Sequence, residues 1–261
     1  MMHITTIAAV SLVLVVAGLL YIYRNRKLRI AAFARQATFG ARSPRDAAFA
    51  LGRTIFSAVK RGPDPLFLTR LLAPLGASPP AILEKSACCS GIHRLYITSL
   101  NTIGVRAAQI SVYSNLGVHC MVQAQIEGER VIIDADYGVW LKHPRGGPIN
   151  LQELQAGVSP IIEPFVFDQV ATYADSTRTP RPAGYPGDAY YRFDFAQTRT
   201  ANWTRSTIRR VVYAVLKPIT RGGVDSLLLP PILEWPEILL ALLLSTVALM
   251  AIVVRFLYPT L

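Results

Sequence analysis

Two uncharged apolar stretches, one near each end of the chain, place the strongest limit on what this sequence can fold into. Residues 7–23 read IAAVSLVLVVAGLLYIY and residues 238–254 read ILLALLLSTVALMAIVV, without a single Asp, Glu, Lys or Arg. Each stretch is just long enough to cross the hydrocarbon core of a bilayer, which is about 30 Å thick. Trp235 and Tyr258 flank the second stretch, and such aromatic rings favour the membrane interface. The sequence therefore predicts two transmembrane helices.

The composition agrees, because 52% of the residues are hydrophobic and only 16% are charged, which is more apolar than an ordinary soluble domain. A cleaved signal peptide is the alternative for the first stretch. Residues 1–6 contain no Lys or Arg, however, and no small-residue cleavage pattern precedes the basic run 24–27. A buried core helix is the alternative for the second stretch, but its uninterrupted apolar length favours a membrane. We expect both helices to be retained as spans.

The basic residues lie on the inner flanks of the two stretches. They are Arg24, Arg26, Lys27, Arg29 and Arg35 after the first, and Arg205, Arg209, Arg210, Lys217 and Arg221 before the second. By the positive-inside rule the middle region lies in the cytoplasm and both termini lie outside. A translocated middle region is the alternative, because long domains cross membranes despite their charge. The sequence predicts an integral protein of the inner, cytoplasmic membrane with two spans.

The net charge of +11 makes nucleic acid a candidate partner. Basic residues beside a span attract anionic lipid head groups without any further partner. The sequence has no alternating basic and aromatic platform, no zinc-finger spacing and no recognised nucleic-acid module. We therefore expect membrane lipid as a partner and no nucleic acid.

The three cysteines do not form a disulfide framework. Cys88 and Cys89 are adjacent and would pair only through a strained ring, which leaves Cys120 unpaired. A zinc site of these cysteines with His119 is an alternative, but the C-x2-C pairs of zinc knuckles are missing. The sequence predicts no metal and no cofactor.

The middle of the chain predicts a helix followed by an antiparallel meander. Residues 89–103 carry apolar side chains at three- and four-residue steps, and Gly104 ends that helix. Residues 107–114, 118–126 and 129–134 are rich in β-branched residues and are separated by short turns. The expected fold class is therefore α+β, with a helix packed on an antiparallel sheet and a transmembrane helix on each side.

Further elements are expected around this unit. Residues 29–60 predict an amphipathic helix that is broken near 40–44, and residues 66–75 predict a short apolar helix. Asn150 and Glu153 form a capping box for a helix over 151–156. Residues 172–203 are rich in Pro, Gly, Arg and Thr and predict a loop, with at most a short strand at 191–195.

Three residues of this unit supply a thiol, an imidazole and a carboxylate, which a cysteine nucleophile needs. Cys89 opens the predicted helix, where free backbone N–H groups and the helix dipole stabilise a thiolate. His119 and Asp134 lie on adjacent strands. A two-residue turn between these strands places both side chains on one face, whereas a three-residue turn places them on opposite faces. Each of the three is also compatible with a purely structural role.

These residues resemble the transglutaminase-like superfamily of papain-like cysteine proteases. That family has a cysteine opening a helix, a Gly-Ile/Val pair one helix later, a histidine on a strand and an aspartate on the next strand. Cys89, Gly104-Val105, His119 and Asp134 follow this order. The resemblance implies Cys89 as nucleophile, His119 as general base and Asp134 as the carboxylate that orients it. The sequence departs from the family pattern at four positions, which are Ala87, Ala108, Met121 and Ala135.

The predicted function is a membrane-tethered thiol enzyme that acts on an amide or ester carbonyl, either as a peptidase or amidase or by acyl transfer. The alternative is an inactive domain of this type that serves as a scaffold or assembly subunit of a membrane complex. A protein or peptide substrate, or a partner subunit, is compatible with either. The predicted organisation is a first transmembrane segment with its basic flank (1–28), a helical connector (29–65), the transglutaminase-like core (66–171), a loop and basic juxtamembrane region (172–236) and a second transmembrane segment (237–261).

Overall fold

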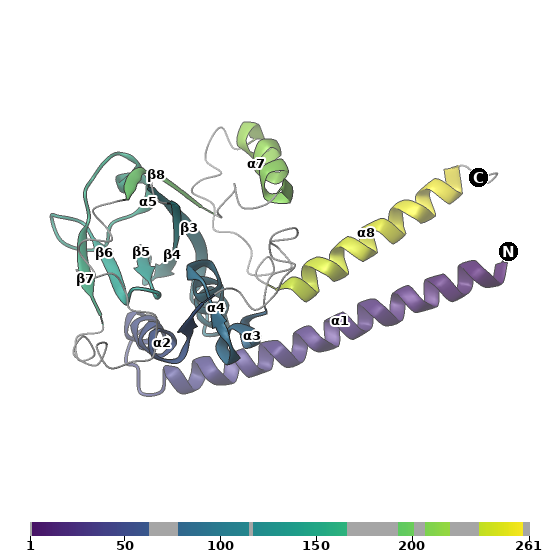
Figure 1. The fold of residues 1–261 in the computed structure, drawn as a ribbon, viewed down its shortest axis with the longest axis horizontal. Coiled ribbons are helices and arrows are strands. Elements are labelled where there is room, and N and C mark those ends of the chain that lie inside the picture. The colour runs from purple at the N-terminus through teal and green to yellow at the C-terminus, as the bar shows by residue number, and fades with distance from the viewer. Residues whose placement is uncertain are drawn as a thin grey trace.

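The computed structural model describes residues 2–62, 78–114, 117–165, 193–200, 207–219 and 235–257. An α+β domain stands at one end of the molecule, and two long helices extend from it (Figure 1). The chain termini lie at the far ends of these helices. The predicted helix over 66–75 and most of the predicted loop over 172–203 lie outside the described residues.

The domain is built on a six-stranded sheet of order β7-β6-β5-β4-β3-β8, in which every neighbouring pair is antiparallel. The strands are β3 (Arg106–Ser114), β4 (Gly117–Ile126), β5 (Glu129–Asp134), β6 (Val139–Lys142), β7 (Ile161–Pro164) and β8 (Asp194–Thr200). The predicted meander is confirmed, because β3, β4 and β5 match the expected ranges to within one residue. Strands β6 and β7 were not expected, and β8 begins where the short strand predicted at 191–195 was to end.

The turn between β4 and β5 sets the register of the sheet. Glu127 and Gly128 have positive φ angles of 53° and 86°, as a two-residue type I′ turn requires. Ile126 consequently pairs with Glu129. The two-residue alternative is therefore correct, and the three-residue alternative is wrong.

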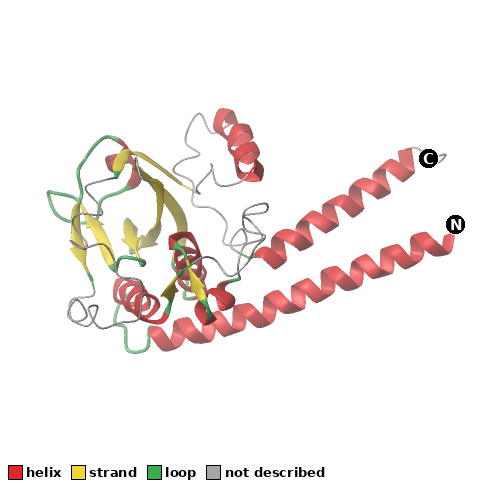
Figure 2. Cartoon of the chain, viewed as in Figure 1, coloured by secondary structure: helices red, strands yellow, loops and turns green. Residues whose placement is uncertain are grey.

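Helix α4 (Cys89–Thr102) lies against one face of the sheet, and α2 (Pro44–Ala58) and α3 (Pro79–Glu84) pack beside α4 (Figure 2). Leu95 and Tyr96 of α4 belong to one buried cluster with Val122 and Ala124 of β4. The Tyr96 hydroxyl also donates a hydrogen bond to the Ala48 carbonyl of α2, at 2.8 Å. Burial of apolar surface and this bond hold α4, and with it the position of Cys89, against the sheet.

The opposite face of the sheet packs on α5 (Leu151–Gln155). Met121 of β4 and Leu154 of α5 belong to this second buried cluster. The predicted capping box is present, since Asn150 and Glu153 each accept a hydrogen bond from the other's backbone N–H. Alternate residues of β4 thus serve two cores, as the two-residue period of a strand requires.

Three smaller elements lie outside the six-stranded sheet and the helices that cover it. Strands β1 (Lys60–Arg61) and β2 (Ser86–Ala87) form a separate parallel pair. Helix α7 (Thr207–Ile219) lies in the region predicted as loop and basic juxtamembrane chain.

The two projecting helices are α1 (Met2–Ala37) and α8 (Pro236–Leu257). Both contain a segment that is long and apolar enough to cross a membrane, at Ala9–Ala37 and Pro236–Val254. Helix α1 continues beyond the predicted span into the domain, where Ile30 and Ala34 are fully buried. No proline interrupts the sequence of this helix, so it has no cause to break at the basic flank.

The bases of the two helices contact each other. Tyr23 of α1 meets Trp235, just before α8, edge to face with ring centroids 5.3 Å apart. Arg26 of α1 forms an ion pair with Glu237 of α8, whose side chain is buried. The two helices therefore leave the domain from one place.

Candidate active site

Cys89 is the first residue of α4, and its side chain is half-buried. Cys88 precedes it in an extended conformation (φ −77°, ψ 174°) as the N-cap residue, with no capping bond from its side chain. The first N–H groups of a helix have no carbonyl one turn before them and carry the positive end of the helix dipole. The Cys89 sulfur thus lies where backbone donors and the dipole favour negative charge.

His119 lies in β4 and pairs across the sheet with Val112 of β3. Its Nε2 is 2.6 Å from Oδ2 of Asp134, the last residue of β5. The ring is also enclosed by Tyr137, edge-on at 5.0 Å, and by Phe193, nearly parallel at 5.5 Å between centroids. His119 is only 7% exposed, so its orientation is fixed by packing as well as by the carboxylate.

Asp134 is fully buried, and backbone groups hold its carboxylate in place. Its Oδ1 accepts hydrogen bonds from the N–H groups of Asp136 and Tyr137, both at 2.9 Å. The turn that follows β5 ends at Gly138, whose N–H bonds back to the Asp134 carbonyl at 2.8 Å. Sequence and turn geometry thus aim Oδ2 at His119.

The charges of His119 and Asp134 reinforce each other. Burial favours the neutral form of His119, but the Asp134 charge and hydrogen bond, together with Cys89, outweigh it and hold the His119 pKa well above 6.5. Burial likewise favours a neutral Asp134, but contacts with His119 and His93 outweigh it and hold the Asp134 pKa well below 3.8. Each group of the buried pair therefore stabilises the charged form of the other.

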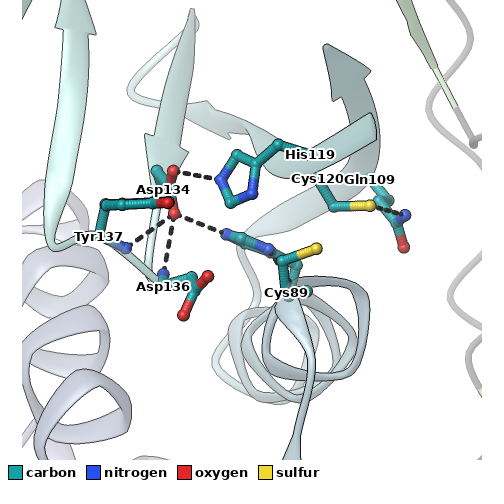
Figure 3. Close-up of polar contacts among 8 residues, drawn as sticks. Cys89, Gln109, His119, Cys120, Asp134, Asp136 and Tyr137 are labelled. Atoms are coloured by element: carbon teal, nitrogen blue, oxygen red, sulfur yellow. Dashed lines mark hydrogen bonds and ion pairs between the residues drawn. The ribbon is translucent and has the colours of Figure 1, made fainter. Parts of the chain in front are cut away.

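Cys89 contributes to the raised pKa of His119 through its charge and its side chain, so the thiol lies beside the imidazole. Because Nε2 of His119 is occupied by Asp134, Nδ1 is the ring nitrogen left for the thiol. Cys89, His119 and Asp134 come together from the start of α4, from β4 and from the end of β5 (Figure 3). The structure thus brings together all three residues that the sequence nominated.

His93 is a fourth member of this cluster that the sequence analysis did not nominate. It lies one turn after Cys89 in α4 and is completely buried. Its Nδ1 is 2.7 Å from the Cys89 carbonyl oxygen, and its Nε2 is 3.2 Å from Oδ1 of Asp134. The four-residue spacing from Cys89 is a sequence signal, because it places both residues on one helix face.

The other two cysteines make different contacts. Cys120 accepts a hydrogen bond from Gln109 Nε2 at 2.9 Å, and Cys88 Sγ lies 3.1 Å from Ser90 Oγ. Cys88, Cys89 and Cys120 are all free thiols. Within the described part of the chain, no group of three or more His, Cys, Asp or Glu residues is arranged to hold a metal ion.

No family model and no curated protein matches the sequence. Among solved structures, a candidate cysteine protease from Cytophaga hutchinsonii is similar to 42% of this chain, with 17% identity and a TM-score of 0.36. A candidate protease from Parabacteroides distasonis is similar to 46% of the chain, with 15% identity and a TM-score of 0.34. The chain spans 37% and 26% of the lengths of these two proteins.

Proposed function

We propose that this protein is a membrane-tethered thiol enzyme that attacks an amide or ester carbonyl through Cys89. The observation that carries the proposal is the 2.6 Å contact between buried His119 and Asp134, beside a thiol at a helix start. A structural histidine does not need a fully buried carboxylate that is itself held by two backbone N–H groups. Such an arrangement is typical of a base that must keep one orientation.

In the first half of the reaction the Cys89 proton moves to Nδ1 of His119, and the thiolate attacks the substrate carbonyl carbon. A C–S bond forms while the carbonyl π electrons move onto oxygen. Collapse of this intermediate breaks the bond to the leaving amine or alcohol, which takes the proton from His119. Asp134 holds Nε2–H throughout, so Nδ1 always faces the sulfur.

In the second half water or an amine attacks the acyl-enzyme and loses its proton to His119. The C–S bond breaks, the leaving thiolate of Cys89 takes the proton back from His119, and the carboxylic acid or the new amide is released. Water gives a peptidase or amidase, and an amine gives acyl transfer. The backbone N–H of Cys89 at the start of α4 is a suitable donor to the developing oxyanion.

Support for tethering comes from α1 and α8, each of which contains a span-length apolar segment. Exposed side chains such as Val13, Leu14, Leu249 and Ile252 are 61–67% accessible, which is costly in water and favourable in lipid. By the positive-inside rule the basic flanks favour the cytoplasmic side of the membrane for the domain. A reporter fused after Leu261 tests this arrangement, because activity on the cytoplasmic side would contradict it.

The test of the chemistry uses a simple activated ester. Full-length protein in detergent micelles is incubated with p-nitrophenyl acetate, and peptide mapping locates the acetyl group. We expect acetylation of Cys89, its loss in Cys89→Ser and its retention in the matched control Cys88→Ser. If Cys89 is not acetylated and Cys89→Ala keeps full cellular function, the scaffold function replaces the enzyme.

A further inference from the structure

We propose that His93 is a positioning residue that ties the start of the nucleophile helix to Asp134, as a ring with hydrogen on both nitrogens. This inference rests on the proposed function, because it concerns how the thiol and the base are kept in register. His93 touches neither the sulfur nor any atom that reacts. Its two contacts instead join the backbone of Cys89 to the carboxylate that orients His119.

The contact with Cys89 defines the hydrogen on Nδ1. The Cys89 carbonyl oxygen has lone pairs and no hydrogen, so it accepts and His93 must donate. At 2.7 Å this bond is short for N–H···O, and it lies within a completely buried side chain. Nδ1 of His93 therefore carries a hydrogen.

The contact with Asp134 defines the hydrogen on Nε2. In a neutral ring with Nδ1–H, Nε2 would have no hydrogen and would lie 3.2 Å from Oδ1 of Asp134, so that two electron-rich atoms would repel each other. A second N–H turns this repulsion into attraction. The contact is too poorly aligned for a hydrogen bond, so it is an ion pair without strong direction.

The charges of the cluster balance in this arrangement. Asp134 is fully buried and lies between two imidazoles, whose rings are edge to face at 5.8 Å. The His119–Cys89 pair is neutral overall whether the proton is on nitrogen or on sulfur. A His93 cation then offsets the Asp134 carboxylate, and no net charge is left in the low-dielectric interior.

His93 links the nucleophile helix to the strands that carry the base and its carboxylate. Cys89 and His93 belong to α4, whereas Asp134 ends β5 and His119 lies in β4. Without His93, packing alone would set the distance from the helix start to the strand ends. Reaction geometry is sensitive to such shifts, since a displacement of about 1 Å costs on the order of 10²-fold in rate.

Three variants of the full-length protein in micelles test this role. His93→Phe keeps the buried ring but has no nitrogen, and His93→Gln keeps an amide donor that reaches toward Asp134. His143→Gln, in the loop after β6, is the matched histidine control. We expect acetylation of Cys89 by p-nitrophenyl acetate to fall about 10²-fold in His93→Phe. It should recover in part in His93→Gln and stay unchanged in His143→Gln, while all variants keep the thermal unfolding transition of a folded domain.

A second measurement does not depend on activity. Nitrogen-15 NMR of wild-type protein at pH 7 should show N–H signals from both ring nitrogens of His93, absent in His93→Phe. A single N–H signal, or wild-type acetylation in folded His93→Phe, overturns the proposal. Failure of the wild type to form any acyl-enzyme rejects the proposed function instead, and the NMR signals still decide the state of His93.

Discussion

At the scale of single residues, Asp134 is the point on which the site depends. Two backbone N–H groups and His119 form hydrogen bonds with it, and Nε2 of His93 lies 3.2 Å from its Oδ1. Three members of this cluster could be identified from the sequence, because the residue types themselves show a thiol, an imidazole and a carboxylate. The sequence analysis missed His93, because a histidine inside a helix equally suits packing or solvent until the contact with Asp134 is known.

Replacement of Asp134 by asparagine separates its charge from its shape. The amide oxygen can still accept the two backbone hydrogen bonds, but the ionic partner of His119 is lost. We expect acetylation of Cys89 to fall on the order of 10²-fold or more, because the imidazole loses its preferred tautomer. Wild-type rates in folded Asp134→Asn protein would show that the carboxylate does not orient His119.

The same pair makes stability depend on pH. The raised His119 pKa stabilises the fold fully below 6.5, and this contribution is lost as pH rises through the folded pKa. The lowered Asp134 pKa stabilises the fold above 3.8, and this contribution is lost as pH falls through the folded pKa. The free energy of unfolding in urea should therefore be largest between pH 3.8 and pH 6.5. Asp134→Asn should make this free energy depend less on pH on both sides of that range. Identical pH profiles for the two proteins would contradict this linkage.

At the scale of elements, the β4–β5 turn decides whether the site can form. The sequence predicted β3, β4 and β5 because each is a β-branched run bounded by turn residues. It left the turn length open between two residues and three, because the pair Glu127-Gly128 does not by itself identify either turn. Strands β6 and β7 have four residues each, and tertiary pairing rather than local pattern defines them, whereas β8 overlaps the short strand predicted at 191–195.

The substitution Gly128→Ala tests the two-residue turn between β4 and β5. The φ of Gly128 is +86°, and a Cβ there would meet no atom within 4 Å, so the cost of Gly128→Ala is one of backbone conformation. We expect the free energy of unfolding to fall by about 1 kcal/mol. Glu129→Ala is the control, since it removes only an exposed ion pair with Arg45 and should cost a few tenths of a kcal/mol. A smaller loss for Gly128→Ala than for the control would contradict the turn assignment.

At the scale of the whole molecule, α1 is both an apolar helix of span length and part of the domain core. The sequence predicted the two apolar segments from composition, and the structure has two helices of that kind. It did not predict that α1 runs unbroken to Ala37, or that its base meets α8. Both facts depend on contacts between residues far apart in the chain.

The Arg26–Glu237 ion pair should couple the two helices. Arg26→Met leaves a buried carboxylate without its partner, which should cost about 1–3 kcal/mol of unfolding free energy. Adding Glu237→Gln removes that unpaired charge and should recover part of the loss. Additive effects of the two substitutions in a double-mutant cycle would show that the pair contributes no coupling.

The central claim is that His119 activates Cys89, and the rate of iodoacetamide alkylation tests it most directly. The measurement uses full-length protein with Cys88 and Cys120 replaced by serine, so that Cys89 is the one thiol, and compares it with the same protein carrying His119→Ala. We predict rapid alkylation of Cys89 at neutral pH and a loss of at least tenfold without His119. Equal rates in two folded proteins would contradict the account and identify a structural thiol.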